Sequence, residues 1–298
     1  MKRFLFFLCL LLNMAFVRAQ YVNSVKVTSL RSDNGEVTFW AENTSYAPHT
    51  VTISFSKLTN TTSAMEGETK EFLVEHGKEQ LFILRPAVPR QGIGYSFRSL
   101  ARKGNLSARV DTDYVYLLPM VVGKPVRPNR MVSMESFLKQ PVKSQRVTGF
   151  SFRTSEGDTI VAARGGLVTE VEDQSASTTE NKSFNATENY VEIYHKDGSF
   201  ARYKLFKNKG VFVFPGDVVI PGQPIGIIGG SNYKGGSHLR FTTYSPSLEN
   251  YSFAPSFYLG EGKTGQPEKN ALYVSEHPQE IIIQEMSKKE KKKYLSNK

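Results

Sequence analysis

Short runs of alternating apolar and polar residues recur along most of the chain, separated by turn residues. Near the start, residues 25–28, 36–41 and 50–55 alternate with a period of two, and Asn34-Gly35 gives a tight-turn signal between the first two runs. Seven such runs at regular intervals predict an immunoglobulin-like β-sandwich over residues 20–118. The remaining four runs lie at 71–74, 80–84, 95–100 and 113–117.

The same strand pattern returns in the second half of the chain, which predicts a second β domain at residues 148–246. Between the two domains, residues 119–147 contain several prolines and no clear period, so we expect a linker or entry segment there. Residues 247–298 are expected to form a C-terminal extension. Its basic run at 288–293 predicts a short helix or a frayed tail. The predicted fold class is therefore all-β.

The first 19 residues have the pattern of a secretion signal. Lys2 and Arg3 precede an apolar run at 4–16, and small residues at 17–19 form a cleavage site. This run is shorter than the ~20 apolar residues that a membrane span needs, and no later segment is longer. The single cysteine, Cys9, lies inside the signal, so disulfides are excluded from the mature chain. We expect a secreted or periplasmic protein, of the kind found in bacterial envelopes.

Charge adds little to this interpretation. The chain has 38 basic and 28 acidic residues, a formal net charge of +10. Three of the basic residues lie in the signal and the tail after 278 is also basic, so the body carries only about +4. We find no aromatic and basic nucleic-acid motif, and no nucleic-acid partner is expected. A weakly basic surface suits an anionic cell wall, although ordinary solubility charge explains it equally well.

Three blocks in the second domain carry a family resemblance. The first reads F-S-F at 150–152 and E-G-D-T-I-V-A-A at 156–163. The second reads N-Y-V-E-I-Y-H-K-D-G at 189–198 and Y-K-L at 203–205, and the third G-D-V-V-I-P-G-Q-P-I-G at 216–226 and H-L-R-F at 238–241. Together they resemble the LytM/lysostaphin-like zinc endopeptidases of peptidase family M23, which cut peptidoglycan cross-bridges. A β domain before such a domain also resembles secreted bacterial members.

The resemblance implies a zinc site whose ligands are mostly absent here. It places the family's aspartate ligand at Ser151, the second histidine of its H-x-H pair at Arg240, and a further catalytic histidine at Leu205. Only the first histidine of the pair is retained, as His238. No histidine occurs between His76 and His195 to serve as the upstream ligand.

These replacements argue against zinc chemistry. A serine hydroxyl is a poor zinc ligand, a guanidinium places a fixed positive charge where a dication would bind, and leucine has no lone pair. Zinc peptidases need three protein ligands and an activated water. We therefore expect no metal, no cofactor and no catalytic residue at this site, and a protein that is not an enzyme.

The remaining side chains could still form a binding groove. His238 and Arg240 are two residues apart on a predicted strand, so both point to one face. Tyr203 and Leu205 are expected to share one face of a neighbouring strand, and Ser151 lies beside them. A cation, an imidazole and an aromatic ring could hold an acidic peptide such as a peptidoglycan stem. Alternatively, Arg240 simply fills the vacated metal site and pairs with a local carboxylate.

Three functions remain open from the sequence. The first is a catalytically inactive homologue that binds peptidoglycan or regulates a cell-wall hydrolase, by analogy with degenerate family members that activate amidases. The second is an active zinc endopeptidase that cleaves peptidoglycan cross-bridges through a rearranged site, in which His195 or Asp173 joins His238. The third is a structural envelope or interaction protein whose N-terminal sandwich is the functional part.

Overall fold

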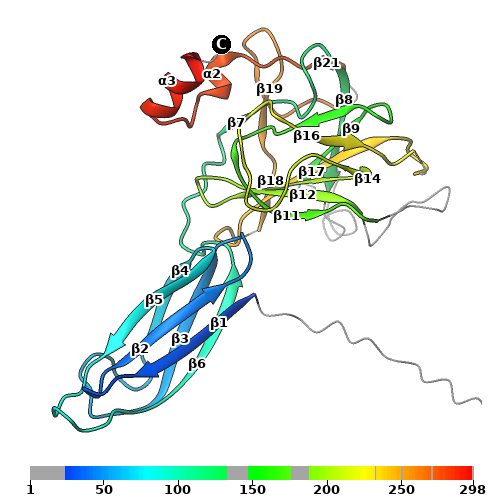
Figure 1. Ribbon diagram of the computed structural model, residues 1–298. Helices are drawn as coiled ribbons and strands as arrows, with labels where there is room; N and C mark the ends of the chain where they lie inside the picture. The colour runs from blue at the N-terminus through cyan, green and yellow to red at the C-terminus, as the bar shows by residue number, and fades with distance from the viewer. Residues whose placement is uncertain are drawn as a thin grey trace, which may run out of the picture.

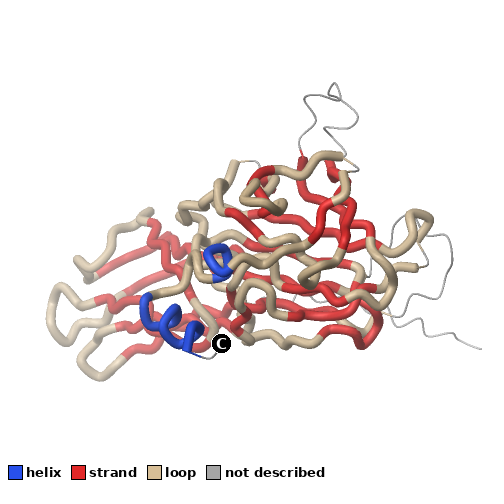
Figure 2. Tube along the Cα trace, turned by 90° about the horizontal axis from the view of Figure 1, so that it is seen from above, coloured by secondary structure: helices blue, strands red, loops and turns tan. Residues whose placement is uncertain are grey.

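The computed structural model describes residues 24–132, 147–175, 188–231, 233–249, 251–269 and 271–296. Among these residues the secondary structure is almost entirely β, with helix only near the C-terminus (Figure 2), which confirms the predicted all-β class. The predicted signal peptide at 1–19 lies outside the described residues. Within them, no helix combines the length and apolar character that a bilayer crossing would require.

The N-terminal sandwich consists of two three-stranded antiparallel sheets (Figure 1). The order β1-β2-β5 in one sheet and the pairing of β3 with β6 in the other correspond to the A-B-E and C-F pairings of immunoglobulin-like sandwiches. The strands are β1 (Val25–Arg31), β2 (Val37–Asn43), β3 (His49–Thr59), β4 (Thr69–Val74), β5 (Gly77–Leu84) and β6 (Gly94–Lys103).

Alternation along these strands produces the core of the sandwich. Val37, Phe39 and Ala41 of β2 are fully buried, while the residues between them are partly exposed. The ring of Phe39 stacks on Phe82 at a centroid distance of 4.6 Å and meets Phe55 edge-on at 5.8 Å across the sandwich. Aromatic contacts between the two sheets thus join them into one hydrophobic core.

The C-terminal β body, residues 114–296, is built around a nine-stranded sheet with the order β15-β11-β12-β13-β17-β9-β8-β21, in which β18 also pairs with β17. Two smaller sheets, β10-β16-β14 and β20-β19-β7, complete it. Its first strands are β7 (Val115–Tyr116), β8 (Pro125–Val132), β9 (Val147–Arg153), β10 (Thr159–Val161), β11 (Gly166–Glu172), β12 (Tyr190–Tyr194), β13 (Phe200–Lys204) and β14 (Phe206–Val211). The later elements are β15 (Val218–Val219), β16 (Pro224–Ile228), β17 (His238–Tyr244), β18 (Ser252–Phe253), β19 (Ser256–Tyr258), β20 (Thr264–Gly265), β21 (Tyr273–Val274), α2 (Gln279–Ile282) and α3 (Lys288–Ser296).

Three segments lie differently from the sequence prediction. The run expected as the seventh sandwich strand is β7, which pairs with β19 and buries Tyr116 in the core of the C-terminal β body. The expected linker at 119–147 contains β8, which pairs with β9 inside the large sheet. The expected extension at 247–298 supplies β18 to β21 and places Phe257 in the core. In each case apolar side chains, not turn residues, decide the packing.

A buried arginine ties the C-terminal segment to the body. Arg164 is fully buried and donates to both carboxylate oxygens of Glu285, just after α2, and to Asp197 at 3.0 Å. Its guanidinium also lies 3.8 Å from the ring centroid of Tyr114. Burying a charge is costly unless it is paired, and here two carboxylates from distant segments balance it.

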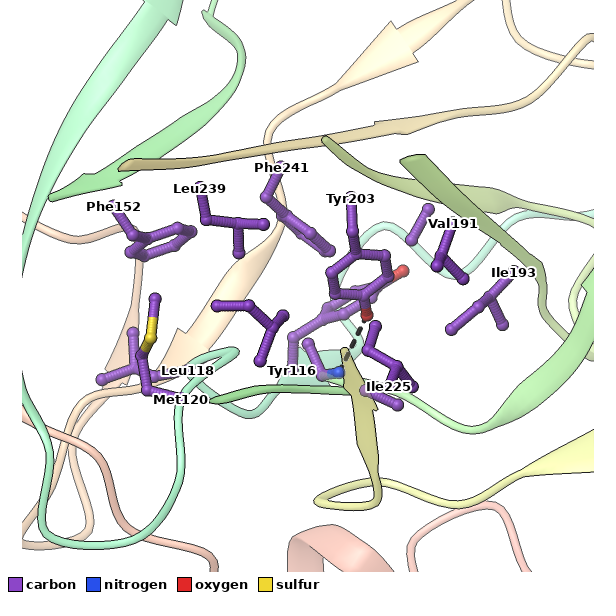
Figure 3. Close-up of a cluster of buried hydrophobic side chains, with 14 of the residues drawn as sticks. Tyr116, Leu118, Met120, Phe152, Val191, Ile193, Tyr203, Ile225, Leu239 and Phe241 are labelled. Carbon is purple, nitrogen blue, oxygen red and sulfur yellow. Dashed lines mark hydrogen bonds between the residues drawn. The ribbon is translucent and has the colours of Figure 1, made fainter. Parts of the chain in front are cut away.

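One face of the large sheet is apolar and packs into the core. Val191, Tyr203, Leu239 and Phe241 point together into it from three adjacent strands (Figure 3). The opposite face carries the polar residues between them, because successive side chains of a strand alternate. The candidate site therefore lies on that second face.

Candidate functional site

The candidate site is built on β9, β17 and β13, which are neighbours in the large sheet. Arg240 of β17 lies directly opposite Ser151 of β9 on one side and Lys204 of β13 on the other. Residues paired in an antiparallel sheet share a face, as do residues two apart along one strand. Ser151, Lys204, His238 and Arg240 therefore share the polar face, as the sequence predicted for His238 and Arg240.

A buried carboxylate accompanies the arginine. Nη1 of Arg240 donates to Oε1 of Glu188 at 2.6 Å, and the Tyr233 hydroxyl donates to the same oxygen at 3.1 Å. Nζ of Lys204 lies 3.3 Å from the other oxygen, Oε2, which accepts no well-aligned hydrogen bond from the described residues. The side chain of Glu188 is only 2% exposed. Two cations thus share one buried carboxylate, in line with the alternative in which Arg240 pairs locally.

His238 is held by the same arginine. Its Nδ1 lies 2.7 Å from the carbonyl oxygen of Gly236, and its Nε2 accepts from Nε of Arg240 at 3.3 Å. Burial lowers the pKa of His238, and the neighbouring guanidinium lowers it further against the opposing effect of the Gly236 carbonyl. The imidazole is thus neutral near pH 7, and the lone pair of Nε2 is directed at a guanidinium.

Two of the predicted groove residues lie elsewhere. Tyr203 is fully buried on the apolar face, where its hydroxyl accepts from the backbone N–H of Ala163 at 2.8 Å (Figure 3). Leu205 follows the end of β13 with φ of +79°, and its side chain is 4% exposed and belongs to the same core. The prediction that these two residues line the groove is therefore wrong. The strand alternation that places Lys204 toward the groove turns Tyr203 away from it.

The hollow on the polar face is displaced from the predicted groove toward the other end of β13 and β17. It has a volume of about 340 Å³. Sequence reasoning identified only Arg240 among its lining residues, although the alternation of Arg202 and Lys204 on either side of a buried tyrosine was a signal that could have found both. The lining consists of Met131, Glu188, Arg202, Lys204, Arg240, Thr242, Tyr244 and Tyr251.

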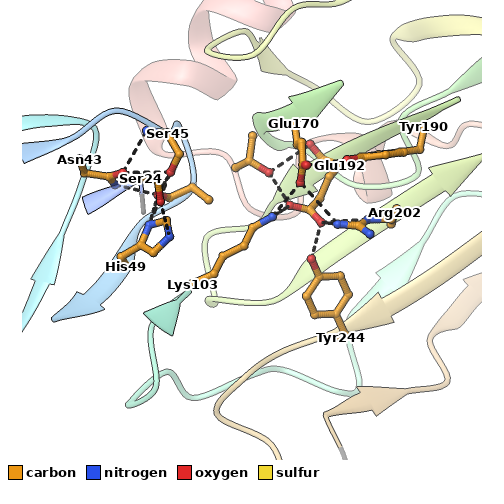
Figure 4. Close-up of polar contacts among 12 residues, drawn as sticks. Ser24, Asn43, Ser45, His49, Lys103, Glu170, Tyr190, Glu192, Arg202 and Tyr244 are labelled. Atoms are coloured by element: carbon orange, nitrogen blue, oxygen red, sulfur yellow. Dashed lines mark hydrogen bonds and ion pairs between the residues drawn. The ribbon is translucent and has the colours of Figure 1, made fainter. Parts of the chain in front are cut away.

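A second ion network adjoins this hollow and reaches the N-terminal sandwich (Figure 4). Glu192 is fully buried and accepts from Arg202 at 3.0 Å, from the Tyr244 hydroxyl and from Lys103 of β6. Lys103 also contacts Glu170 at 3.0 Å. Burial alone would raise the pKa of Glu192, but Lys103 and Arg202 outweigh it and hold that pKa below its usual value. Glu192 therefore balances the positive charge of Arg202.

A comparison with known protein families finds a match within the C-terminal β body. The model of peptidase family M23 matches residues 145–251. These residues form an M23 peptidase domain. They include all of the strands that carry Ser151, Lys204, His238 and Arg240.

Three solved structures show similarity to this chain. The catalytic domain of lysostaphin from Staphylococcus simulans is 23% identical, with 35% of this chain and 72% of that chain covered and a TM-score of 0.28. Pseudoalterin, an M23 metalloprotease from the deep sea, is 15% identical over 55% and 97% of the chains, with a TM-score of 0.33. Helicobacter pylori Csd3 is 14% identical over 91% and 83%, with a TM-score of 0.33. Among curated proteins, none matches this chain.

The described residues of the M23 domain do not offer a donor set that fits zinc. Where a ligand triad would be required, the polar face presents a hydroxyl, one imidazole and a guanidinium, and only the imidazole is a good zinc ligand. Upstream of Ser151 on β9, Val147, Thr148 and Gly149 carry neither imidazole nor carboxylate. Across the described part of the chain, no cluster of three or more His, Cys, Asp or Glu side chains is arranged to hold a metal.

The residues suggested for a rearranged site do not join His238. His195 is fully buried, with its Nδ1 2.8 Å from the carbonyl oxygen of Gly165, and its ring faces Tyr116 in the core. One carboxylate oxygen of Asp173 accepts hydrogen bonds from the backbone N–H groups of Gly210 and Val211, which holds the end of β14 in place. Both residues therefore have structural roles away from the polar face.

Proposed function

We propose that this chain is a non-catalytic M23 protein that binds peptidoglycan through the cationic hollow of its M23 domain. In this proposal it acts in the periplasm or outside the cell after removal of its signal. The observation that carries the proposal is the Arg240–Glu188 pair. The guanidinium of Arg240 takes the place of a metal. It donates hydrogen bonds to His238 and to the buried carboxylate of Glu188, so the lone pairs that would bind a metal are already engaged.

Loss of the metal does not remove the attraction for anions. Lys204 and Arg240 share the single carboxylate of Glu188, so the hollow has one positive charge without a partner among these three groups. Stem peptides and exposed sugar carboxylates of peptidoglycan are anionic. A concave site with positive charge and aromatic walls suits such a ligand.

The test combines metal content with binding and cleavage. The untagged mature protein is dialysed against zinc and then buffer, and its metal is measured by elemental analysis beside His238→Ala. The same proteins are incubated with purified sacculi, and both sedimentation and released muropeptides are measured. We expect sub-stoichiometric zinc that does not depend on His238, no cleavage, and sedimentation that weakens as salt rises.

A second variant tests the excess positive charge of the hollow. Lys204→Met leaves the Arg240–Glu188 pair intact and removes that excess charge, so we expect it to sediment less with sacculi. Lys207→Met, an exposed lysine outside the hollow, should sediment like the wild type. Near-stoichiometric zinc lost in His238→Ala, together with cleavage lost in that variant, would overturn the proposal in favour of an active endopeptidase.

A further inference from the structure

The most exposed aromatic side chain in the hollow is Tyr251. It is 55% exposed, yet its position is fixed from several sides. Its ring stacks on Tyr244 at a centroid distance of 5.0 Å and 21°, and Tyr244 in turn stacks on Phe200 at 5.0 Å and 9°. A ladder of three stacked rings therefore runs from the buried Phe200 to the exposed Tyr251, which lines the hollow.

The backbone of Tyr251 is held as firmly as its ring. Its φ of +59° lies in the left-handed region, which is unfavourable for a residue with a bulky side chain. Its N–H donates to the carbonyl of Leu248 at 3.0 Å, and its carbonyl accepts from the N–H of Ser245 at 2.7 Å. Residue 252, next in the chain, already pairs with β17. A rigid, exposed aromatic face at a concave site is suited to ligand contact, because little conformational entropy is lost on binding.

Ring and charge lie in the same hollow. Tyr251 and Tyr244 line it together with Lys204 and Arg240, whose two positive charges share only Glu188. The face of a pyranose ring is a row of C–H bonds that packs on an aromatic face, while a carboxylate on the same sugar pairs with a cation. The described residues therefore provide an aromatic ring for stacking and, among Lys204, Arg240 and Glu188, one positive charge in excess.

We propose that the hollow recognises a sugar ring carrying a carboxylate, with the ring stacked on Tyr251 and the carboxylate on Lys204 and Arg240. This inference rests on the proposed function and names the glycan strand, not the stem peptide, as the part of peptidoglycan that is bound. Lactyl carboxylates of such strands are free only where the peptide has been removed. The ligand would therefore be the product of an amide hydrolysis.

Three probes separate ring from charge. Glycan strands freed of peptide carry rings and carboxylates, chitotetraose carries similar rings without carboxylates, and a free stem peptide carries carboxylates without rings. Binding of each to the full mature chain is measured by calorimetry at low and physiological salt. We expect the peptide-free strands to bind at least about tenfold more tightly than either of the other probes, and to lose affinity as salt rises.

Matched variants assign the two contacts. Tyr251→Ala should weaken glycan binding about tenfold and Tyr251→Phe should not, because the ring face is what matters. Tyr251→Leu still covers Tyr244 but offers no flat face, so it should also weaken glycan binding about tenfold. It keeps the test decisive if the alanine variant does not fold. Lys204→Met should weaken binding of the peptide-free strands about tenfold and leave chitotetraose unchanged, while Lys207→Met alters neither.

The outcomes distinguish this inference from the proposed function. A stem peptide that binds as tightly as the glycan, a chitotetraose that does so, or unchanged glycan binding by Tyr251→Leu would overturn the inference. In each of those cases, sedimentation of the wild type with sacculi would leave the proposed function standing. Absence of binding to both sacculi and peptide-free glycan strands would overturn both.

Discussion

Replacing Glu188 by glutamine keeps the volume of the side chain and removes its charge. Arg240 and Lys204 would then lose their shared counter-charge, at present 2.6 Å and 3.3 Å away. Breaking a fully buried pair by removing one partner costs about 3–5 kcal/mol. The side chains of Arg240 and Lys204 are 18% and 33% exposed, so water can solvate part of the charge that loses its partner. We expect a loss of about 2 kcal/mol of unfolding free energy.

The assay is urea unfolding of the mature chain at pH 7, followed by two signals. Far-UV circular dichroism reports both bodies, while fluorescence of Trp40, the only tryptophan in the chain, reports the N-terminal sandwich. With a urea dependence of about 2 kcal/mol per molar, Glu188→Gln should lower the midpoint of the M23 domain by about 1 M. The Trp40 midpoint should not move.

A double-mutant cycle decides whether the charge pair is the cause. Arg240→Met in the Glu188→Gln background removes the orphaned guanidinium, so much of the lost stability should return. Two results would refute the reasoning: a Glu188→Gln variant that unfolds at the wild-type urea concentration, or single-variant losses that simply add in the double variant.

Three further predictions follow from other charges. Burial and the nearby Arg164 lower the pKa of His195 to about 3 from 6.5, so the unfolded chain binds one more proton than the folded chain between those pH values. The unfolding free energy therefore decreases by about 1.4 kcal/mol for each unit by which the pH falls through that range. His195→Gln should therefore flatten the slope of unfolding free energy against pH by that amount in urea titrations from pH 4 to 6; an unchanged slope would contradict the buried neutral imidazole. Lys103→Met removes one of the cations that contact Glu192. It should lower the unfolding free energy measured by circular dichroism by about 1 kcal/mol and leave the transition measured by Trp40 fluorescence unchanged. The exposed Lys57→Met should change neither measurement. Arg240→His places an imidazole beside His238 and frees Glu188 as a third donor, so elemental analysis should find nearly one zinc per chain, against none for Arg240→Met; a folded, zinc-free histidine variant would show that the guanidinium is not what excludes the metal.

The sequence was sufficient to predict where strands form and that two of the site residues share one face. Period-two alternation identified β17, and the same alternation placed His238 and Arg240 on one face, because that inference needs only local geometry. The family motif identified the M23 domain because its three blocks include turn and strand residues that the fold requires. Local pattern and motif were both short-range signals, and both were reliable here.

Long-range pairing was beyond the same reasoning. β7 alternates like a sandwich strand, and only its partner β19, some 140 residues later, assigns it to the other body. Tyr203 and Leu205 were assigned to the groove because alternation says only that they share a face. The register that pairs Lys204 with Arg240 turns both of them into the core instead. Glu188 was hidden in a polar stretch without a period. A buried arginine requires a counter-ion, but the sequence does not say which carboxylate supplies it.

If the proposed function is correct, electrostatics explains how a groove of this fold could lack catalysis and still attract anions. Lewis acidity needs a metal with an open coordination position, and a guanidinium has neither empty orbitals nor exchangeable ligands. Attraction for a carboxylate needs only positive charge, and Lys204 with Arg240 exceeds Glu188 by one. Because these charges are partly exposed, the attraction would be modest and screened by salt. In the proposed complex, Tyr251 would therefore supply the rest of the binding free energy. A ligand that offered charge alone would therefore bind weakly, and one that offered a sugar face as well would not.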